Sequence, residues 1–304
     1  MTESPTGQTV LVTGGAGFIG SHLVDALIEA NDVRIVDDFS SGRRENLRDD
    51  VTVFEGDIRD DDLLERAVSG VDLIYHTAAL VSVSASVEDP LLSHSTNAAA
   101  TVSLLEHARE VDARVVLSSS AAIYGQPEDV PISESHPKNP ESPYGADKLA
   151  LDTYARIYHD LYGLETVALR YFNVYGPRQT AGDYSGVISI FLDQATSNRP
   201  ITVEGDGEQT RDFVHVRDVV RANLAAGTTD AVGRAYNVGT GDSISINELA
   251  AAIRDAADSS SEITHVDARS GDVRDSRADI SRIRESLGYE PTVTLENGLA
   301  SLCE

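Results

Sequence analysis

The stretch that decides the fold runs from Thr9 to Ala30 and reads "TVLVTGGAGFIGSHLVDALIEA". Its first five residues are apolar or β-branched, as in a buried strand, and the apolar positions from Ile19 onward recur with helical spacing. Between them lie Gly14, Gly17 and Gly20. Glycine permits a tight turn and lets the backbone approach a pyrophosphate, which the N–H groups of a helix N-terminus then stabilise. The stretch therefore predicts a strand, turn and helix that bind a dinucleotide.

A second apolar run, "VRIVD", ends at Asp37, 20 residues after Gly17. A glycine pattern alone is weak evidence because glycine-rich turns are common, and Asp37 supplies the missing context. A carboxylate at this place accepts hydrogen bonds from an adenosine ribose and repels a 2′-phosphate, so it favours NAD. Arg43 and Arg44 leave an alternative open, since arginines there either bind a 2′-phosphate or form a surface turn.

Further apolar runs alternate with helical patterns up to about residue 172, and the expected strands include "VTVFEG", "DLIYHTA", "RVVLSSS" and "TVALRYF". Strands separated by helices form a parallel sheet, and continuous Val/Ile/Leu runs fit strands buried on both faces. We predict an α/β fold: a Rossmann-type doubly wound parallel sheet with a smaller, interleaved C-terminal substrate domain. Residues 1–172 and about 212–239 would form the NAD-binding domain. Residues 173–211 and 240–304 would form the nucleotide-sugar-binding domain.

Length and composition bound the class of protein. The 304 residues, 41% of them hydrophobic, are enough for a sizeable core. No apolar run approaches the roughly 18 residues of a membrane span, and "MTESPTGQ" lacks the features of a secretory signal. Cys303 is the only cysteine, so neither an intrachain disulfide nor a cysteine metal cluster is possible, and we expect no metal. These features predict a soluble, cytoplasmic protein.

The net charge of −26 reflects 50 acidic residues against 24 basic ones, of which only Lys138 and Lys148 are lysines. The acids are scattered along the chain. One interpretation is a halophilic surface, where carboxylates hold water and salt screens their repulsion; the other is an acidic surface for a basic partner. The scatter and the scarcity of lysine favour the first. Nucleic-acid binding is disfavoured because no basic stripe exists to neutralise phosphates.

The segment "SPYGADKLALDTYARIYHDLYG" carries Tyr144 and Lys148 four residues apart, on one face of a predicted helix. A tyrosine with a pKa of about 10 is a poor base, but a lysine cation and an oxidised nicotinamide both stabilise the phenolate. Such a tyrosine exchanges a proton with a substrate hydroxyl while hydride moves to or from the cofactor. Ser120, at the end of "RVVLSSS", is placed to hold the same oxygen. A Tyr/Lys pair alone is more often a surface pair, but its setting behind a dinucleotide loop favours catalysis.

Six motifs occur in order: "TGGAGFIG", "SSSAAIYG", "SPYGADK", "RYFNVYGPR", "RDFVHVRD" and "RSGDVRDSRAD". Together they resemble the extended short-chain dehydrogenase/reductase family, and in particular its NAD-dependent nucleotide-sugar epimerases of the UDP-glucose 4-epimerase type. The resemblance covers nearly the whole chain. It implies an isomerase with NAD as the cofactor and a nucleotide sugar, UDP-linked, as the substrate. It also implies a homodimer formed by the helices near residues 90–110 and 142–162.

The resemblance also implies roles for individual residues. The residues implied on the cofactor side are Gly14, Gly17, Phe18, Ile19 and Gly20 at the pyrophosphate, Asp37 at the adenosine ribose, Asp57 and Ile58 at the adenine, and Ala78, Ala79, Leu80, Asn97 and Ser118 along the cofactor. The residues implied at the reacting sugar and the nucleotide are Tyr144 as base, Lys148 on the nicotinamide ribose, Ser120 on the substrate hydroxyl, Asn173, Arg211 and Arg269 at the diphosphate, Asp272 near the nucleotide ribose, and Ser276 at the wall of the sugar pocket. Some alternatives stay open: Asp57 or Asp60 as a helix N-cap, and surface ion pairs for the arginines.

Ala121 and Ala122 follow Ser120, where relatives that dehydrate or decarboxylate nucleotide sugars carry acidic residues. Alanine is neither an acid nor a base, so transient oxidation at C4 and return of hydride to the other face fit best. The predicted reaction is C4 epimerisation of UDP-glucose or UDP-galactose. A nucleotide-sugar reductase or dehydrogenase, a hexuronate epimerase and a non-catalytic binding protein remain alternatives.

Ser276 bears on the choice of sugar. A bulky aromatic residue at this wall would restrict the pocket, whereas a small residue leaves room for an N-acetyl group at C2. Ser276 therefore predicts tolerance of N-acetylhexosamine substrates. The alternative is a surface serine in a charged loop.

Overall fold

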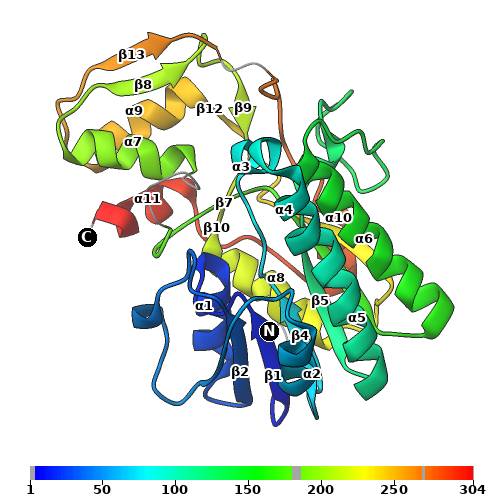
Figure 1. The fold of residues 1–304 in the computed structure, drawn as a ribbon. Coiled ribbons are helices and arrows are strands. Elements are labelled where there is room, and N and C mark those ends of the chain that lie inside the picture. The colour runs from blue at the N-terminus through cyan, green and yellow to red at the C-terminus, as the bar shows by residue number, and fades with distance from the viewer. Residues whose placement is uncertain (1–3, 180–185, 269–270, 304) are drawn as a thin grey trace.

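A computed structural model describes residues 4–179, 186–268 and 271–303 (Figure 1). Its centre is a seven-stranded sheet in the order β11-β6-β5-β4-β1-β2-β3, with every neighbouring pair parallel. The strands are β1 (Thr9–Thr13), β2 (Asp32–Asp37), β3 (Thr52–Glu55), β4 (Leu73–His76), β5 (Arg114–Ser120), β6 (Thr166–Tyr171) and β11 (Arg234–Val238). The chain order reverses beside β1, where ligands bind in doubly wound sheets. The predicted fold class is confirmed.

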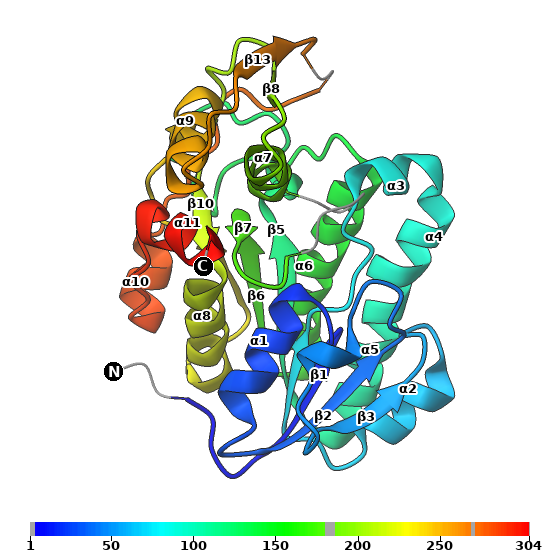
Figure 2. The same ribbon diagram turned by 90° about the vertical axis from the view of Figure 1, so that its left-hand side faces the viewer.

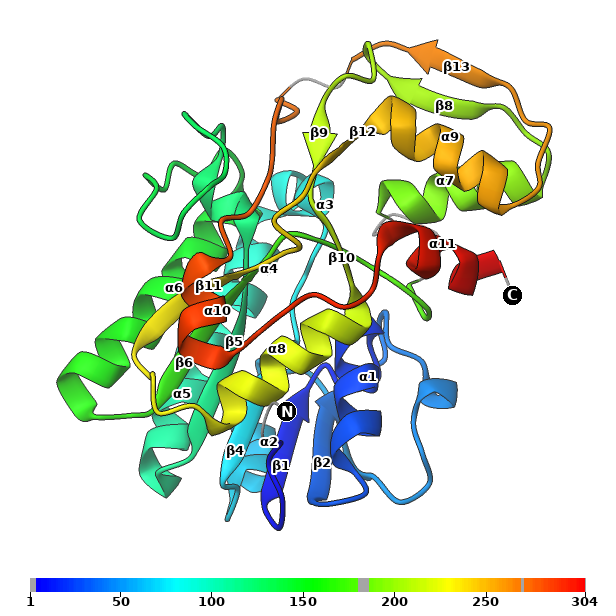
Figure 3. The same cartoon turned by 180° about the vertical axis from the view of Figure 1, so that it is seen from behind.

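Helices cover both faces of this sheet (Figures 1 and 3). One face carries α1 (Phe18–Leu27) and α8 (Val216–Thr228), and the other carries α2 (Asp61–Val68), α5 (Ala100–Val111) and α6 (Pro143–Tyr162). Within β1, Val10 and Val12 belong to the first core and Leu11 to the second. Successive strand residues point to opposite faces, so a strand buried on both sides must be apolar throughout.

Local signals fix where α6 begins and ends. The Ser142 side chain accepts a hydrogen bond from the Gly145 N–H at 3.0 Å, and Pro143 occupies the first turn. Gly163, with φ of 74°, ends the helix in the left-handed conformation that glycine adopts at low cost. Tyr144 is thereby placed in the first turn, at the same edge of the sheet as the end of β5.

The helix expected near residues 90–110 is present in three pieces. They are α4 (Pro90–His94), a π-helical turn (Ser95–Ala99) and α5. A short helix, α3 (Val83–Glu88), precedes them and was not predicted. The π-helical turn carries Asn97, one of the predicted site residues.

A second group of elements lies above the large sheet in the orientation of Figure 2. It comprises α7 (Val187–Thr196), β8 (Ile201–Glu204), β9 (Thr210–Arg211), β12 (Ile244–Ser245), α9 (Ile246–Ala256), β13 (Ile263–Val266) and α11 (Leu295–Cys303). It has its own core, which includes Phe191, Val203 and Leu249. The parallel pair β7 (Asn173–Tyr175) and β10 (Phe213–His215) runs between the two groups.

The C-terminal segment contributes both to the core of the large sheet and to the core of the smaller group. α10 (Ser281–Leu287) packs with the large sheet, because Ile280, Ile283 and Tyr289 belong to the same core as β1 and α8. The sequence assigned residues 240–304 to the smaller domain, and that boundary stays a prediction. Among the helices of the described residues, none is both long and apolar enough to cross a membrane.

Candidate active site

The glycine loop between β1 and α1 is shaped by contacts that exclude a side chain. At Gly14, where φ is 69°, an added Cβ would lie 2.8 Å from the backbone of Ala78, and at Gly20 it would lie 2.1 Å from the Gly14 carbonyl oxygen. Gly17 precedes α1 and has no side chain to cap it, so the N–H groups of Phe18 and Ile19 begin the helix without a capping side chain. The helix N-terminus therefore has the backbone donors and the positive potential that a pyrophosphate requires.

Asp37 is joined to this loop. Its side chain is 7% exposed, one carboxylate oxygen accepts the Ala16 N–H at 2.8 Å, and the other accepts the Phe39 N–H at 2.9 Å. Burial raises the pKa of Asp37, while these two backbone donors oppose the rise. The two features that predicted a dinucleotide site thus meet, and a ribose hydroxyl is the kind of donor that the remaining lone pairs of Asp37 can accept.

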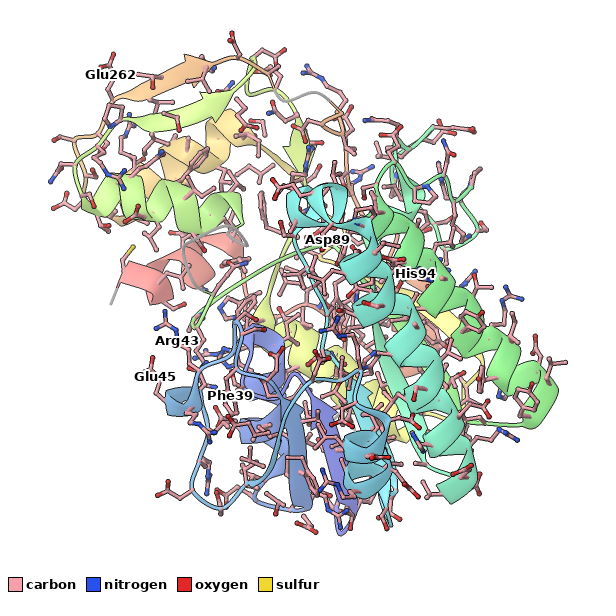
Figure 4. All side chains as sticks on the ribbon, in the orientation of Figure 1. Phe39, Arg43, Glu45, Asp89, His94 and Glu262 are labelled. Carbon is pink, nitrogen blue, oxygen red and sulfur yellow. The ribbon has the colours of Figure 1, made fainter. Side chains whose placement is uncertain are left out.

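The arginines after β2 form surface pairs. Arg43 pairs with Glu45 at 3.1 Å, and Arg44 pairs with Glu55 and stacks 4.2 Å from the centre of the Phe39 ring (Figure 4). Both guanidinium groups are well exposed. This arrangement favours the surface-turn alternative for both arginines.

The residues predicted at the adenine, Asp57 and Ile58, differ in their surroundings. The Asp57 carboxylate is paired with Arg59, which lowers its pKa, and Asp60 rather than Asp57 caps α2 by accepting the Leu63 N–H at 3.2 Å. Ile58 is buried in the core beneath. Asp57 is therefore not the helix cap.

The segment that follows β4 is held by a buried polar network. The Ala78 N–H donates to the Thr13 hydroxyl at 3.2 Å, and the Asn97 amide both accepts from the Leu80 N–H at 2.8 Å and donates to the Leu80 carbonyl at 3.0 Å. His76, which the sequence analysis missed, hydrogen-bonds to Thr13 at 2.8 Å, and burial lowers its pKa to about 3, so it is neutral. The network fixes the backbone of residues 78–80, including Ala79, against the glycine loop.

Tyr144, Lys148 and Ser120 come together where β5 ends and α6 begins. The Lys148 ammonium donates to the Ser118 carbonyl at 2.8 Å and lies 5.8 Å from the centre of the Tyr144 ring. Burial lowers the pKa of Lys148 to about 8. Burial raises the pKa of Tyr144, and a hydrogen bond with the Ser120 side chain opposes that rise. A phenol, a nearby cation and a hydroxyl are thus assembled for proton transfer.

The predicted nucleotide-side residues gather around β9 and β10. Arg211 pairs with Asp272 at 2.5 Å, and the Asn173 amide donates to the Asp212 carbonyl at 3.1 Å. The Ser276 N–H donates to the Thr210 carbonyl at 3.1 Å. Ser276 is 8% exposed, so the surface-serine alternative is wrong. Arg269 lies outside the described residues.

Asp212 is a second residue that sequence reasoning missed. Its fully buried carboxylate accepts hydrogen bonds from the backbone N–H groups of Thr240, Gly241 and Ala278. It therefore joins β9 to the two segments that flank the predicted sugar side. Its place directly after Arg211 was the only signal in the sequence.

The described residues fit a dinucleotide cofactor in three respects. The glycine loop leaves no room for side chains, Asp37 is fixed beside it, and the 78–80 backbone is held at the same edge. Ser118 accepts a hydrogen bond from Lys148 through its carbonyl oxygen, and its hydroxyl lies 3.1 Å from that of Tyr171. The site roles themselves stay predictions.

Comparisons with known proteins agree with this geometry. A family model described as "NAD dependent epimerase/dehydratase family" matches residues 10–239. A UDP-glucose 4-epimerase of Mycolicibacterium smegmatis is 43% identical over 303 residues, which is 97% of each chain. UDP-glucuronic acid decarboxylase 1 of Arabidopsis thaliana is 36% identical over 299 residues, covering 95% of this chain and 68% of the plant protein.

A solved structure gives the same result for the fold. The UDP-N-acetylglucosamine 4-epimerase of Methanobrevibacter ruminantium, in complex with UDP-N-acetylmuramic acid, has a TM-score of 0.94 and 38% identity to this chain. The likeness covers 98% of this chain and 97% of the other. The sequence motifs, the site geometry and these relatives lead to one conclusion: the protein belongs to the NAD-dependent epimerase/dehydratase family.

Proposed function

We propose that this enzyme interconverts the C4 epimers of a UDP-linked hexose through a transient 4-keto sugar. The observation that carries the proposal is the cluster of Ser120, Tyr144 and Lys148 at the end of β5, in the same parallel sheet whose β1 and β2 end at the glycine loop and Asp37. Bound NAD supplies a reversible transfer of hydride to and from a sugar carbon. The residues of the chain must then move one proton and hold the sugar while its stereochemistry changes.

Tyr144 accepts the proton of the C4 hydroxyl as the C4–H bond breaks and the C4 carbonyl forms. Lys148 stabilises the phenolate electrostatically before the proton arrives, and Ser120 donates a hydrogen bond to the same sugar oxygen. After the 4-keto sugar has turned, the opposite face of C4 would be the one to take up hydride from bound NAD, and Tyr144 gives its proton back to O4. Proton and hydride both return to the sugar, so no external oxidant or reductant is consumed.

The residues after Ser120 weigh against dehydration and decarboxylation. Ala121 and Ala122 form a short 3₁₀ turn, and the Ala122 N–H donates to the Ser120 hydroxyl at 3.2 Å. Neither alanine can donate or accept a proton at C5 or C6. This distinguishes our proposal from the activity named for the Arabidopsis relative, although the fold is shared.

The nucleotide side supports a UDP-sugar with a tolerant sugar pocket. Arg211 has the fork geometry that matches phosphate oxygens, and Asn173 and Asp272 lie with it on the same side of the molecule. Ser276 is small and nearly buried, so it supports room for an N-acetyl group. The Methanobrevibacter relative is named for such a substrate.

We also infer a homodimer that pairs α4, α5 and α6 with their counterparts. These helices expose apolar side chains, with Leu91 82% and Leu161 69% exposed, beside the less exposed Tyr162 and Val111. Burial of such side chains is the main source of stability in a dimer interface. The acidic surface supports function at high salt, and a cytoplasmic location stays an expectation from the sequence.

The test is a chromatographic assay of purified protein in high salt, with no added nicotinamide cofactor. UDP-glucose, UDP-galactose, their N-acetyl counterparts and UDP-glucuronate are offered separately. We expect the C4 epimer from at least one hexose or N-acetylhexosamine, without net oxidation. Product from UDP-glucuronate alone would favour the hexuronate alternative, and stoichiometric cofactor reduction would favour the dehydrogenase alternative.

A further inference from the structure

Asp147 is a buried acid that the mechanism above does not use. It directly precedes Lys148 on α6 and is 5% exposed. A buried carboxylate is costly unless it is hydrogen-bonded or paired. Asp147 has two partners, both on α4: the Ser93 hydroxyl donates to it at 2.6 Å, and the His94 ring nitrogen Nδ1 lies 3.0 Å away.

Further hydrogen bonds connect these residues to the segment predicted to line the cofactor. The Ser93 hydroxyl oxygen accepts from the Asn97 amide at 3.4 Å, and Asn97 in turn holds the backbone of Leu80. His94 lies at the solvent-facing end of this set of contacts, with its side chain exposed on α4 beside α6 (Figure 4). Asp147 therefore connects the helix that carries Tyr144 and Lys148 to the segment that lines the predicted cofactor site.

The charge that acts on Lys148 comes from Asp147, the preceding residue on α6. Lys148 meets the Ser118 carbonyl on β5, the Tyr144 ring on its own helix, and His76 on β4, which is neutral. Burial lowers the pKa of Lys148, and the charge of Asp147 opposes that effect. Charges interact strongly where water is excluded, so one carboxylate has a large effect there.

We propose that Asp147 is a positioning residue that keeps Lys148 protonated and fixes α6 against the α4 segment that carries Ser93 and Asn97. The proposal rests on the proposed function, because it matters only if Lys148 must be a cation beside Tyr144. His94 contributes from the solvent side, where its Nδ1 lies 3.0 Å from the Asp147 carboxylate and holds that carboxylate against α4.

The test uses the holoenzyme and the variant Asp147→Asn, which removes the charge and keeps an oxygen that accepts from Ser93. Without the charge, Lys148 loses its proton at lower pH. We expect the alkaline fall of kcat to move down by about one pH unit, so that kcat is about five-fold lower near pH 8 and about ten-fold lower at higher pH. KM for the UDP-sugar should stay within about two-fold. The phenolate absorbance of Tyr144, isolated by subtracting the Tyr144→Phe spectrum, should appear at higher pH.

The matched control is Asp160→Asn, which removes an exposed carboxylate farther along the same helix and should leave both readouts unchanged. Ser93→Ala keeps the charge but removes one hydrogen bond, so it should move both readouts in the same direction by less. It also provides the test if Asp147→Asn does not fold. If neither readout moves in a folded variant, Asp147 has no such role. If the unaltered enzyme converts no UDP-sugar, the proposed function fails, and the Tyr144 absorbance still decides the electrostatic proposal.

Discussion

The proposed catalytic cluster (Ser120, Tyr144 and Lys148) and the proposed nucleotide-side pair (Arg211 and Asp272) are built differently. The catalytic cluster lies on a long strand and a 20-residue helix, and Lys148 is fixed by a buried hydrogen bond. The nucleotide-side pair lies on a two-residue strand and a loop, and its charges already satisfy each other. Under the proposed function, the fold sets the catalytic geometry in advance, whereas Arg211 would exchange a carboxylate for a phosphate when substrate binds.

The largest effect should come from Tyr144→Phe, which removes the only proposed proton acceptor. General base catalysis is worth 10²–10⁴-fold, so we expect kcat to fall about 10³-fold while the protein retains its NAD. The measurement is turnover together with the cofactor content of the purified variant. Tyr154→Phe, on the exposed side of the same helix, is the control and should be close to the unaltered enzyme. Turnover that survived Tyr144→Phe would contradict the mechanism.

Arg211→Ala tests the nucleotide-side pair. Losing one charged hydrogen bond to a diphosphate costs about 1.5–3 kcal/mol, so KM should rise about 10- to 100-fold, with kcat changed far less. Steady-state kinetics separates the two constants. Arg254→Ala removes a surface arginine that pairs with Asp255 and should change neither. A fall in kcat with constant KM would place Arg211 in the catalytic cluster instead.

A smaller, selective effect is expected from Ser276→Tyr. The larger side chain occupies a nearly buried position, so it should lower kcat/KM for an N-acetylhexosamine substrate about ten-fold more than for a plain hexose. The ratio of the two kcat/KM values is the readout, with Ser276→Ala as the small-residue control. An equal loss for both substrates would mean that Ser276 does not face the C2 substituent.

The smallest effect concerns pH in the unaltered enzyme. The pKa of Lys148 is lowered to about 8, so its charge is present below that pH and lost above it. We expect kcat to halve near pH 8 at constant salt and to keep falling. A kcat that rises steadily through pH 10 would indicate that the charge of Lys148 does not limit the reaction.

The sequence predicted those parts of the site that depend on short spacing along the chain. Gly14, Gly17 and Gly20 lie in one turn, and Tyr144 and Lys148 lie one helical turn apart, so their relation follows from local geometry. The partners of Asp147 could not be predicted, because Ser93 and Asn97 come from a distant segment and meet it only after packing. The short helix α3 was missed because "VSASVE" lacks a regular apolar spacing.

Asp57 and Ser276 also show that contacts formed on folding could not be predicted from the sequence. The sequence left open whether Asp57 caps a helix, and only the structure shows Arg59 folded back onto it. Ser276 lies among charged residues that suggest exposure, yet its backbone pairs with Thr210 and buries it. Both outcomes depend on contacts that form only when the chain has folded.

The path of the chain between the two cores has a consequence for folding. After β6 the chain enters the smaller core, returns with α8 and β11, leaves again for α9, comes back at Ile280 and Tyr289, and ends in the smaller core with α11. The core shared by α1 and α8 draws on residues from Val10 to Tyr289, so no single cut would leave it in one fragment. A ribosome must therefore release nearly the whole polypeptide before this core is complete, and its loss on denaturation should involve both ends of the chain at once.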